Sequence, residues 1–125
     1  MVVAALLSGA GAGARAREVL RRDPDLHAPH LLDVEVTAAL RRRVRLGQTK
    51  LTLADEALAD LGQLPVLRWG HEPLVGRVWA MRDNVSTYDA MYVALAEALD
   101  APLLTTDLRL AHAPGLTCPV EVLLD

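Results

Sequence analysis

The sequence predicts an α/β fold in which a central parallel sheet is flanked by helices. Apolar stretches that suit strands alternate along the chain with amphipathic stretches that suit helices. The apolar pair Leu103 and Leu104, followed by two threonines, is typical of a strand buried on both faces of such a sheet. With 125 residues, 52% of them hydrophobic and 23% charged, the chain is long enough for one well-packed core. We therefore expect a single globular domain spanning residues 1–125.

The expected elements follow one another without an internal repeat. Residues 1–7 are apolar, but so short a run cannot be assigned to strand or helix by its periodicity. Residues 9–13 form a glycine-rich joint that lacks the spacing of a dinucleotide-binding loop. The first expected elements are a helix over 14–22, a strand over 26–28 and a helix over 30–46, which Pro29 opens as its first residue and Gly47 closes. A helix over 53–64 capped by Thr52, a strand over 65–69 and a helix over 72–81 follow, and the core face of the last is expected to be Leu74, Val75, Val78 and Trp79. The chain then continues with a helix over 87–99, a strand from Leu103, a short turn or helix over 108–112 and a strand over 120–124.

The helix over 87–99 places an acid at its start. Ser86 is a suitable N-cap, and apolar residues recur at helical spacing from Tyr92 onward. Asp89 lies in the first turn, where the helix dipole favours a negative charge. It shares a row with Tyr92, so we expect its carboxylate to point inward. An unpaired inward charge is costly, and a bound cation would remove that cost.

A second acid follows the strand that begins at Leu103. Pro102 ends the preceding helix, and Asp107 falls just past the carboxyl end of the strand. Open α/β sheets bind ligands at this edge. Asp107 has a simpler interpretation as the cap of the following short helix.

The helix over 30–46 carries one acid on each of two faces. Glu35 shares its row with Leu31, Ala38 and Ala39 and is expected on the buried stripe, whereas Asp33 is expected at the surface. The arginines at positions 41, 42, 43 and 45 suit a solvated face, with a phosphate-binding or partner-binding patch as the alternative.

Composition excludes several classes of protein. The single cysteine, Cys118, rules out disulfide frameworks and cysteine-based zinc sites and agrees with the cytoplasm as location. With only four aromatic residues, base stacking is not expected to be the main mode of binding nucleic acid. The net charge of −3 gives no overall electrostatic attraction to nucleic acid. No apolar run is long enough for a membrane span, and no leader pattern opens the chain. The four histidines lack metal-ligand spacing, and phosphate-loop and serine-elbow motifs are absent from the sequence.

Glu35, Asp89 and Asp107 together favour a hard divalent cation. Each acid has a plain structural interpretation, as an ion-pair partner, a helix-dipole charge or a helix cap. Taken as a set, three carboxylates supply the oxygen ligands that Mg²⁺ or Mn²⁺ prefers. We therefore expect the three side chains to meet in space.

These residues resemble the PIN-domain ribonucleases of the VapC toxin type. The resemblance rests on H-L-L-D-V-E-V-T-A-A-L-R-R around Glu35, Y-D-A-M-Y-V-A-L-A-E-A-L around Asp89 and P-L-L-T-T-D-L-R-L around Asp107, and it runs over nearly the whole chain. It implies a PIN-like three-layer fold and Mg²⁺- or Mn²⁺-dependent cleavage of RNA. It also implies a homodimer and inhibition by a cognate antitoxin protein. Thr105 matches the hydroxyl residue of the family's T-x-D motif, with ordinary strand propensity as the alternative.

The chain departs from the family pattern at its beginning. Family members open with a hydrophobic strand ending in Asp, and a helix resembling V-V-A-A-L-L follows. Residues 1–7 match that helix, so we expect the first strand and the first acid to be missing. Either the start has been assigned downstream of the true one, which we favour, or this is a shortened form. A lost ligand would weaken metal binding and catalysis.

The resemblance supports an endoribonuclease in which Glu35, Asp89, Asp107 and a fourth acid hold one or two ions. In such a site the ion activates water for in-line attack on the phosphodiester. A catalytically impaired PIN domain that only binds its antitoxin is the alternative. A receiver-like phosphoacceptor domain is disfavoured, because the single lysine, Lys50, lies in an expected loop.

Overall fold

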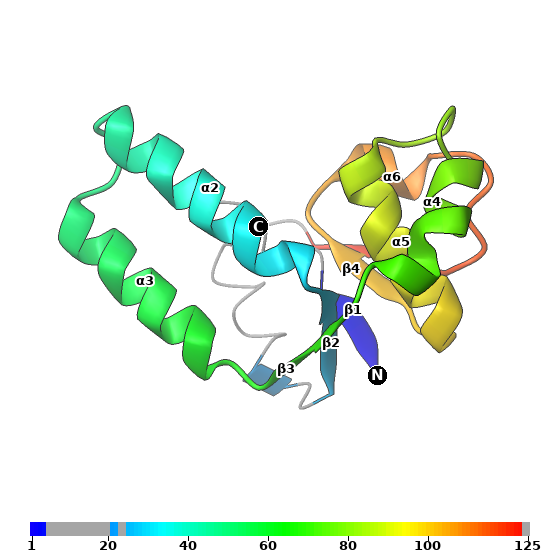
Figure 1. Ribbon diagram of the computed structural model, residues 1–125, viewed down its shortest axis with the longest axis horizontal. Coiled ribbons are helices and arrows are strands. Elements are labelled where there is room, and N and C mark those ends of the chain that lie inside the picture. Colours follow the sequence, from blue (N-terminus) through cyan, green and yellow to red (C-terminus); the bar gives the residue numbers. More distant parts are fainter. Residues whose placement is uncertain (5–20, 23–24, 124–125) are drawn as a thin grey trace.

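A five-stranded parallel sheet lies between two layers of helices in the computed structural model (Figure 1), which describes residues 1–4, 21–22 and 25–123. The strand order is β3-β2-β1-β4-β5. The elements, in chain order, are β1 (Val2–Ala4), β2 (Leu26–Pro29), α2 (Leu31–Arg45), α3 (Leu51–Gln63), β3 (Val66–Trp69), the 3₁₀ turn η2 (Glu72–Leu74), α4 (Val75–Ala80), α5 (Thr87–Leu99), β4 (Leu103–Thr105), α6 (Leu108–Ala111) and β5 (Val120–Val122). This confirms the predicted α/β class.

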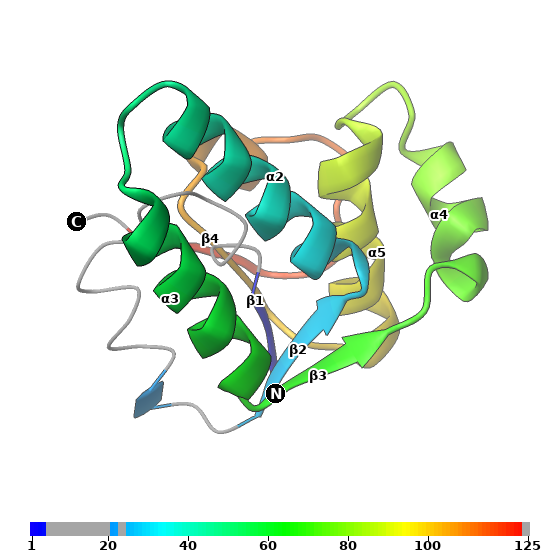
Figure 2. The ribbon, with the colours of Figure 1, turned by 60° about the vertical axis from the view of Figure 1, so that its left-hand side comes forward.

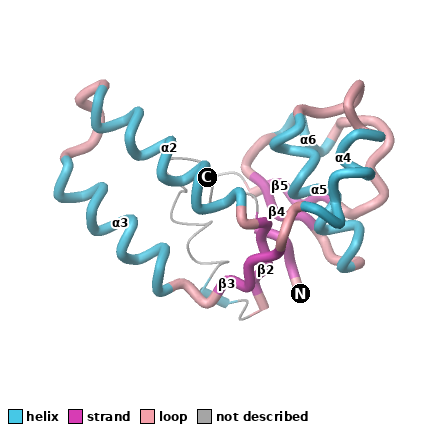
Figure 3. The backbone as a smooth tube through the Cα atoms, in the orientation of Figure 1, coloured by secondary structure: helices cyan, strands magenta, loops and turns pink. Residues whose placement is uncertain are grey.

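The two layers of helices pack on opposite faces of the sheet. Figure 2 shows α2 and α3 in front of the strands, with α5 behind them. Successive residues of a strand point to opposite faces. Accordingly, Val3 and Leu103 pack into the core beneath α4, α5 and α6, whereas Val2 and Leu104 pack into the core beneath α2 and α3. Figure 3 shows the strands gathered between these layers.

The structure contains a strand at the start of the chain, so the expectation that the first strand is missing was wrong. Val2–Ala4 forms β1, which pairs with β2 through Val2 and Leu26 and with β4 through Val3 and Leu103. Pairing on both sides satisfies backbone groups that an empty central position would leave exposed at two edges. Pairing with β2 and β4 therefore makes residues 2–4 a strand, although the periodicity of the sequence does not distinguish a strand from a helix there.

The helix α5 is capped and buried as its sequence predicts. The Ser86 hydroxyl accepts a hydrogen bond from the Asp89 backbone N–H at 3.1 Å. Residues 90–96 are all buried, so nearly the whole circumference of this helix lies within the protein. Asp100 ends it in the left-handed conformation, with φ at 51°. The two ends of α5 are therefore fixed by local chemistry and its middle by the core.

Several predicted boundaries differ from the structure. Lys50, and not Thr52, precedes the first residue of α3, and Pro29 ends β2 before α2 begins at Leu31. The helix expected over 72–81 is divided into η2 and α4. Pro73 lies in the first turn, where a residue without a backbone N–H is tolerated because no intrahelical hydrogen bond is lost.

The expected core face of the helix over 72–81 is half wrong. Leu74 and Val78 are buried, but Val75 and Trp79 are 53% and 68% exposed. The six-residue helix α4 packs only one narrow face against α5, so Val75 and Trp79 on its other faces remain exposed to solvent.

The remaining expectations fall partly outside the described residues. The glycine joint over 9–13 lies there entirely, as does the helix over 14–22 except for residues 21 and 22, which are helical. Among the helices that the structure describes, none combines the length and the apolar character needed to cross a bilayer.

Candidate active site

A pocket of about 470 Å³ opens at the carboxyl edge of the sheet, beside the start of α5 and the end of β4. Two of the three predicted acids, Asp89 and Asp107, line it. The other lining residues are Asn84, Val85, Ser86, Arg109, Leu110 and Ala113. The chain thus brings together two carboxylates that are 18 positions apart in the sequence.

Asp89 reaches this pocket from the first turn of α5. Its backbone N–H is held by the Ser86 hydroxyl, and its side chain is half-buried. The buried residues that follow fix the rotation of the helix, and with it the direction of this carboxylate.

Asp107 is held by the strand before it and by the helix after it. Its backbone N–H donates to the Thr105 hydroxyl at 3.0 Å, and its carboxylate accepts from the Arg109 backbone N–H at 2.9 Å, which caps α6. Thr105 itself is buried in β4. Thr105 therefore acts on the backbone of Asp107, and the capping interpretation of Asp107 is confirmed.

The Arg109 guanidinium bonds the Asp107 carboxylate through two nitrogens at 3.2 Å. These hydrogen bonds hold the pKa of Asp107 below its usual value, although partial burial opposes the change. The pKa of Arg109 is raised, chiefly by Asp107 and in smaller part by the charge of Asp89. Asp107 is consequently ionised at neutral pH. Because the Arg109 side chain is 91% exposed, it can leave this carboxylate at little cost.

Glu35 lies apart from the residues that line the pocket. It is half-buried in the second turn of α2, and its Oε1 accepts a hydrogen bond from the Tyr92 hydroxyl at 2.6 Å. Tyr92 follows Asp89 on α5 by three residues, so the two are neighbours on the helix surface. Glu35 therefore contacts the helix that carries Asp89, although it is not part of the pocket wall.

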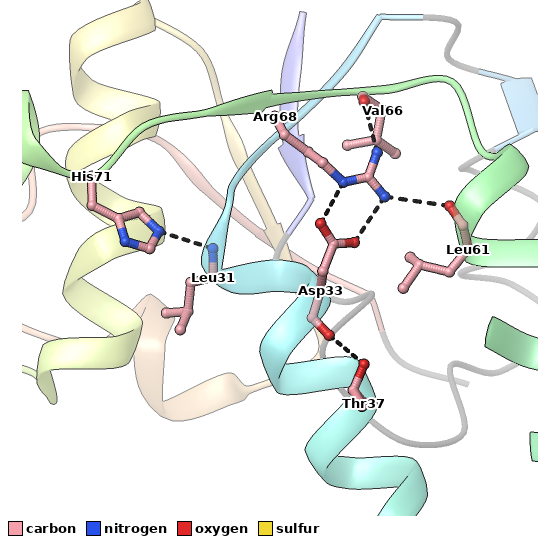
Figure 4. A network of polar contacts seen from close by, with 7 residues as sticks. All are labelled: Leu31, Asp33, Thr37, Leu61, Val66, Arg68 and His71. Atoms are coloured by element: carbon pink, nitrogen blue, oxygen red, sulfur yellow. Dashed lines mark hydrogen bonds and ion pairs between the residues drawn. The ribbon is translucent and has the colours of Figure 1, made fainter.

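Two polar contacts that the sequence did not predict fix the start of α2 (Figure 4). The Nε2 atom of His71 accepts the Leu31 backbone N–H at 2.9 Å, which satisfies one free donor of the helix N-terminus. Asp33, expected to be an ordinary surface acid, accepts two hydrogen bonds from Arg68 at 2.7 and 2.9 Å. A histidine 40 positions away leaves no local signal for such a cap.

The residues of the pocket fit a hard divalent cation that is bound by few protein ligands and keeps several of its water molecules. Mg²⁺ is usually held by one or two carboxylates and keeps several waters for contacts with substrate phosphates. Asp89 and Asp107 supply two carboxylates, and the open pocket leaves space for water. Within residues 1–4, 21–22 and 25–123, no group of three or more His, Cys, Asp or Glu side chains is arranged to hold an ion. Asp89 and Asp107 are therefore the two carboxylates that this pocket offers to a cation.

Fold and pocket together define an α/β domain with an acidic site at its strand ends, and comparison with known proteins specifies the family. The family model described as PIN domain matches residues 1–116. The chain belongs to the PIN-domain family, and its relatives place it with the VapC type.

The similar proteins include several mycobacterial ribonucleases. Ribonuclease VapC1 of Mycobacterium tuberculosis is 48% identical over 120 residues, which cover 93% of this chain and 88% of the relative. Ribonuclease VapC9 of the same species is 42% identical over 97 residues, covering 78% and 76%. Ribonuclease VapC3 is 46% identical over 88 residues, covering 70% and 64%.

Proposed function

We propose that this chain is a metal-dependent endoribonuclease, the toxin of a toxin–antitoxin pair, which hydrolyses phosphodiester bonds of RNA. The observation that carries the proposal is the pocket in which Asp89 and Asp107 meet, in a chain whose relatives are named ribonucleases. The other members of the proposal are RNA as substrate, a cognate antitoxin protein as inhibitor, a homodimer as assembly and the cytoplasm as location. We also propose that residues 1–125 act as one domain.

In this proposal Asp89 and Asp107, with Glu35 beside them, hold Mg²⁺ or Mn²⁺. A bound ion of this kind lowers the pKa of its water and stabilises charge on the phosphate. Thr105 keeps the backbone of Asp107 in place through its hydroxyl. Arg109, exposed at the rim, offers a planar donor for a phosphate oxygen once it leaves Asp107.

Cleavage of a labelled single-stranded RNA by the purified chain tests the proposal. We expect cleavage with Mg²⁺ or Mn²⁺ and its loss in EDTA. Asp89→Asn and Asp107→Asn should each lower the rate by about 100-fold or more, because an ion supplies several kcal/mol of charge stabilisation. Asparagine is also a good N-cap, so the second variant keeps α6 capped while it removes the charge.

Asp55→Asn is the matched control, because it removes the same charge from an exposed position on α3. It should cleave as the unchanged chain does. If the unchanged chain were inert with both ions, or if the two pocket variants stayed active, the proposal would be wrong. Growth inhibition on expression gives a second test, since a chain that only binds an antitoxin would not inhibit growth.

A further inference from the structure

We infer that Tyr92, three residues after Asp89 on α5, is a positioning residue whose hydroxyl holds the carboxylate of Glu35 in the orientation that the proposed cation site needs. The inference rests on the proposed function, because it assigns Glu35 a part in holding the cation. Its basis is the hydrogen bond that the Tyr92 hydroxyl donates to Glu35 Oε1 at 2.6 Å.

This bond joins two helices on which the proposed site depends. Glu35 lies on α2, and Tyr92 lies on α5 three residues after Asp89. Positions three apart on a helix are surface neighbours. The bond therefore ties the carboxylate of Glu35 on α2 to the helix that carries Asp89.

Tyr92 is a rigid point from which to hold another side chain. Only 2% of its surface is exposed, and its neighbours Met91 and Val93 are buried as well. Its ring cannot move without disturbing the core beneath α5. Glu35, in contrast, has a flexible side chain on a helix that is only partly buried. The rigid partner thus restricts the mobile one.

The hydrogen bond leaves one carboxylate oxygen available. Oε1 of Glu35 accepts the phenol proton, whereas no described residue donates a hydrogen bond to Oε2. An oxygen that is oriented but not engaged is what a cation or its bound water requires. The other contacts that hold α2, from His71 and Arg68, act at Leu31 and Asp33 and do not reach this carboxylate.

Tyr92→Phe tests the inference, because it removes the hydroxyl and keeps the ring that fills the core. We expect the dissociation constant for Mn²⁺, measured by calorimetry without RNA, to rise about fivefold, which is the effect of losing the hydrogen bond to Glu35. The Mg²⁺ concentration for half-maximal cleavage should rise by the same factor. Tyr88→Phe, on the same helix but 62% exposed, is the control and should change neither value.

A double-mutant cycle separates positioning from general stability. If Tyr92 acts through Glu35, Tyr92→Phe should not weaken Mn²⁺ binding further in a Glu35→Ala chain. An equal loss in both backgrounds, or wild-type Mn²⁺ affinity in Tyr92→Phe, would overturn the inference while leaving the proposed function intact. Failure of the unchanged chain to bind Mn²⁺ and to cleave RNA would remove both. Measurements well below each variant's unfolding temperature keep stability from entering the comparison.

Discussion

The two layers of helices position their acids by different means. On one face of the sheet, α5 buries every residue from 90 to 96, and the core itself fixes Asp89. On the other face, α2 buries only Leu32, while Val34 on the same helix is 65% exposed. The position of Glu35 therefore depends on a few polar contacts. Asp89 is held by the packing of many buried side chains, so no single substitution removes all of its support. Glu35 is held by separate polar contacts, each of which one substitution can remove.

The ion pairs of the two layers differ in the same direction. On the α5 face, Arg77 bonds Glu97 at 2.7 and 3.1 Å, and only 10% of the Glu97 side chain is exposed. On the α2 face, Arg68 bonds Asp33 at similar distances, but 42% of the Asp33 side chain is exposed. The exposure of the arginines runs the other way, at 39% for Arg77 and 21% for Arg68, so solvent screening differs chiefly at the carboxylates.

Leu95→Ala should give the largest effect, because it opens a cavity in the core beneath α5. Leu95 is 2% exposed, and comparable truncations cost about 3 kcal/mol. Leu58→Ala on α3, which is 37% exposed, should cost less than about 1 kcal/mol. Urea unfolding of both variants measures the difference, and equal losses would contradict the contrast between the layers.

Acidification should weaken the α5 face next. The Arg77 guanidinium and then the Thr117 hydrogen bonds lower the pKa of Glu97 from 4.5 to about 2, against the opposing effect of burial. Because the folded pKa is the lower one, this stabilisation is complete above about pH 4.5 and is lost as pH falls through 2. Because the Arg77 partner is 39% exposed and solvent screens the pair, the loss should amount to about 2 kcal/mol and not to the full value of the pKa change. Unfolding of Glu97→Gln across this range should show a flatter pH dependence than the unchanged chain.

Asp33→Ala should have a smaller effect, on the α2 face. It removes the two hydrogen bonds from Arg68, but the pair is partly solvated, so we expect a loss of about 1 kcal/mol. Denaturant titration at low and high salt measures it. An effect as large as that of Glu97→Gln at neutral pH would show that exposure does not distinguish the two pairs.

Val34→Ser should be nearly neutral, within about 0.5 kcal/mol, because its side chain already lies in solvent. Val93→Ser, the same change at a fully buried position of α5, serves as its counterpart and should be strongly destabilising. Thermal unfolding of the pair compares the layers with identical chemistry. A marked destabilisation by Val34→Ser would mean that this face of α2 is covered.

Local patterns predicted the parts of the fold that local chemistry determines. The Ser86 cap, the end of α5 and the strand after Pro102 all follow from neighbouring residues, and each is confirmed. Val75 and Trp79 were misassigned to the core, because a short helix does not show how far its apolar face extends. The strand β1 depends on two neighbours that lie far along the chain, so its own three residues could not identify it.

Only the part of the acidic pocket that follows from the order of helices and strands could be predicted from the sequence. Asp89 and Asp107 belong to a helix start and a strand end that a parallel arrangement places at one edge, so their proximity follows from order along the chain. The bond between Glu35 and Tyr92 joins residues 57 positions apart, and the cap on Leu31 comes from His71. Side-chain pairs at such separations leave no periodic signal, and the meeting of all three acids remains a prediction.

The central position of β1 has a consequence for biosynthesis. Val3 pairs with Leu103, a partner that leaves the ribosome 100 residues later. The edge of β1 that faces β4 therefore stays unpaired until most of the protein has been translated, although β2 can pair with its other edge early, and the sheet is completed only near the end of synthesis. Chaperones that shield short apolar segments have their longest opportunity to act on this strand.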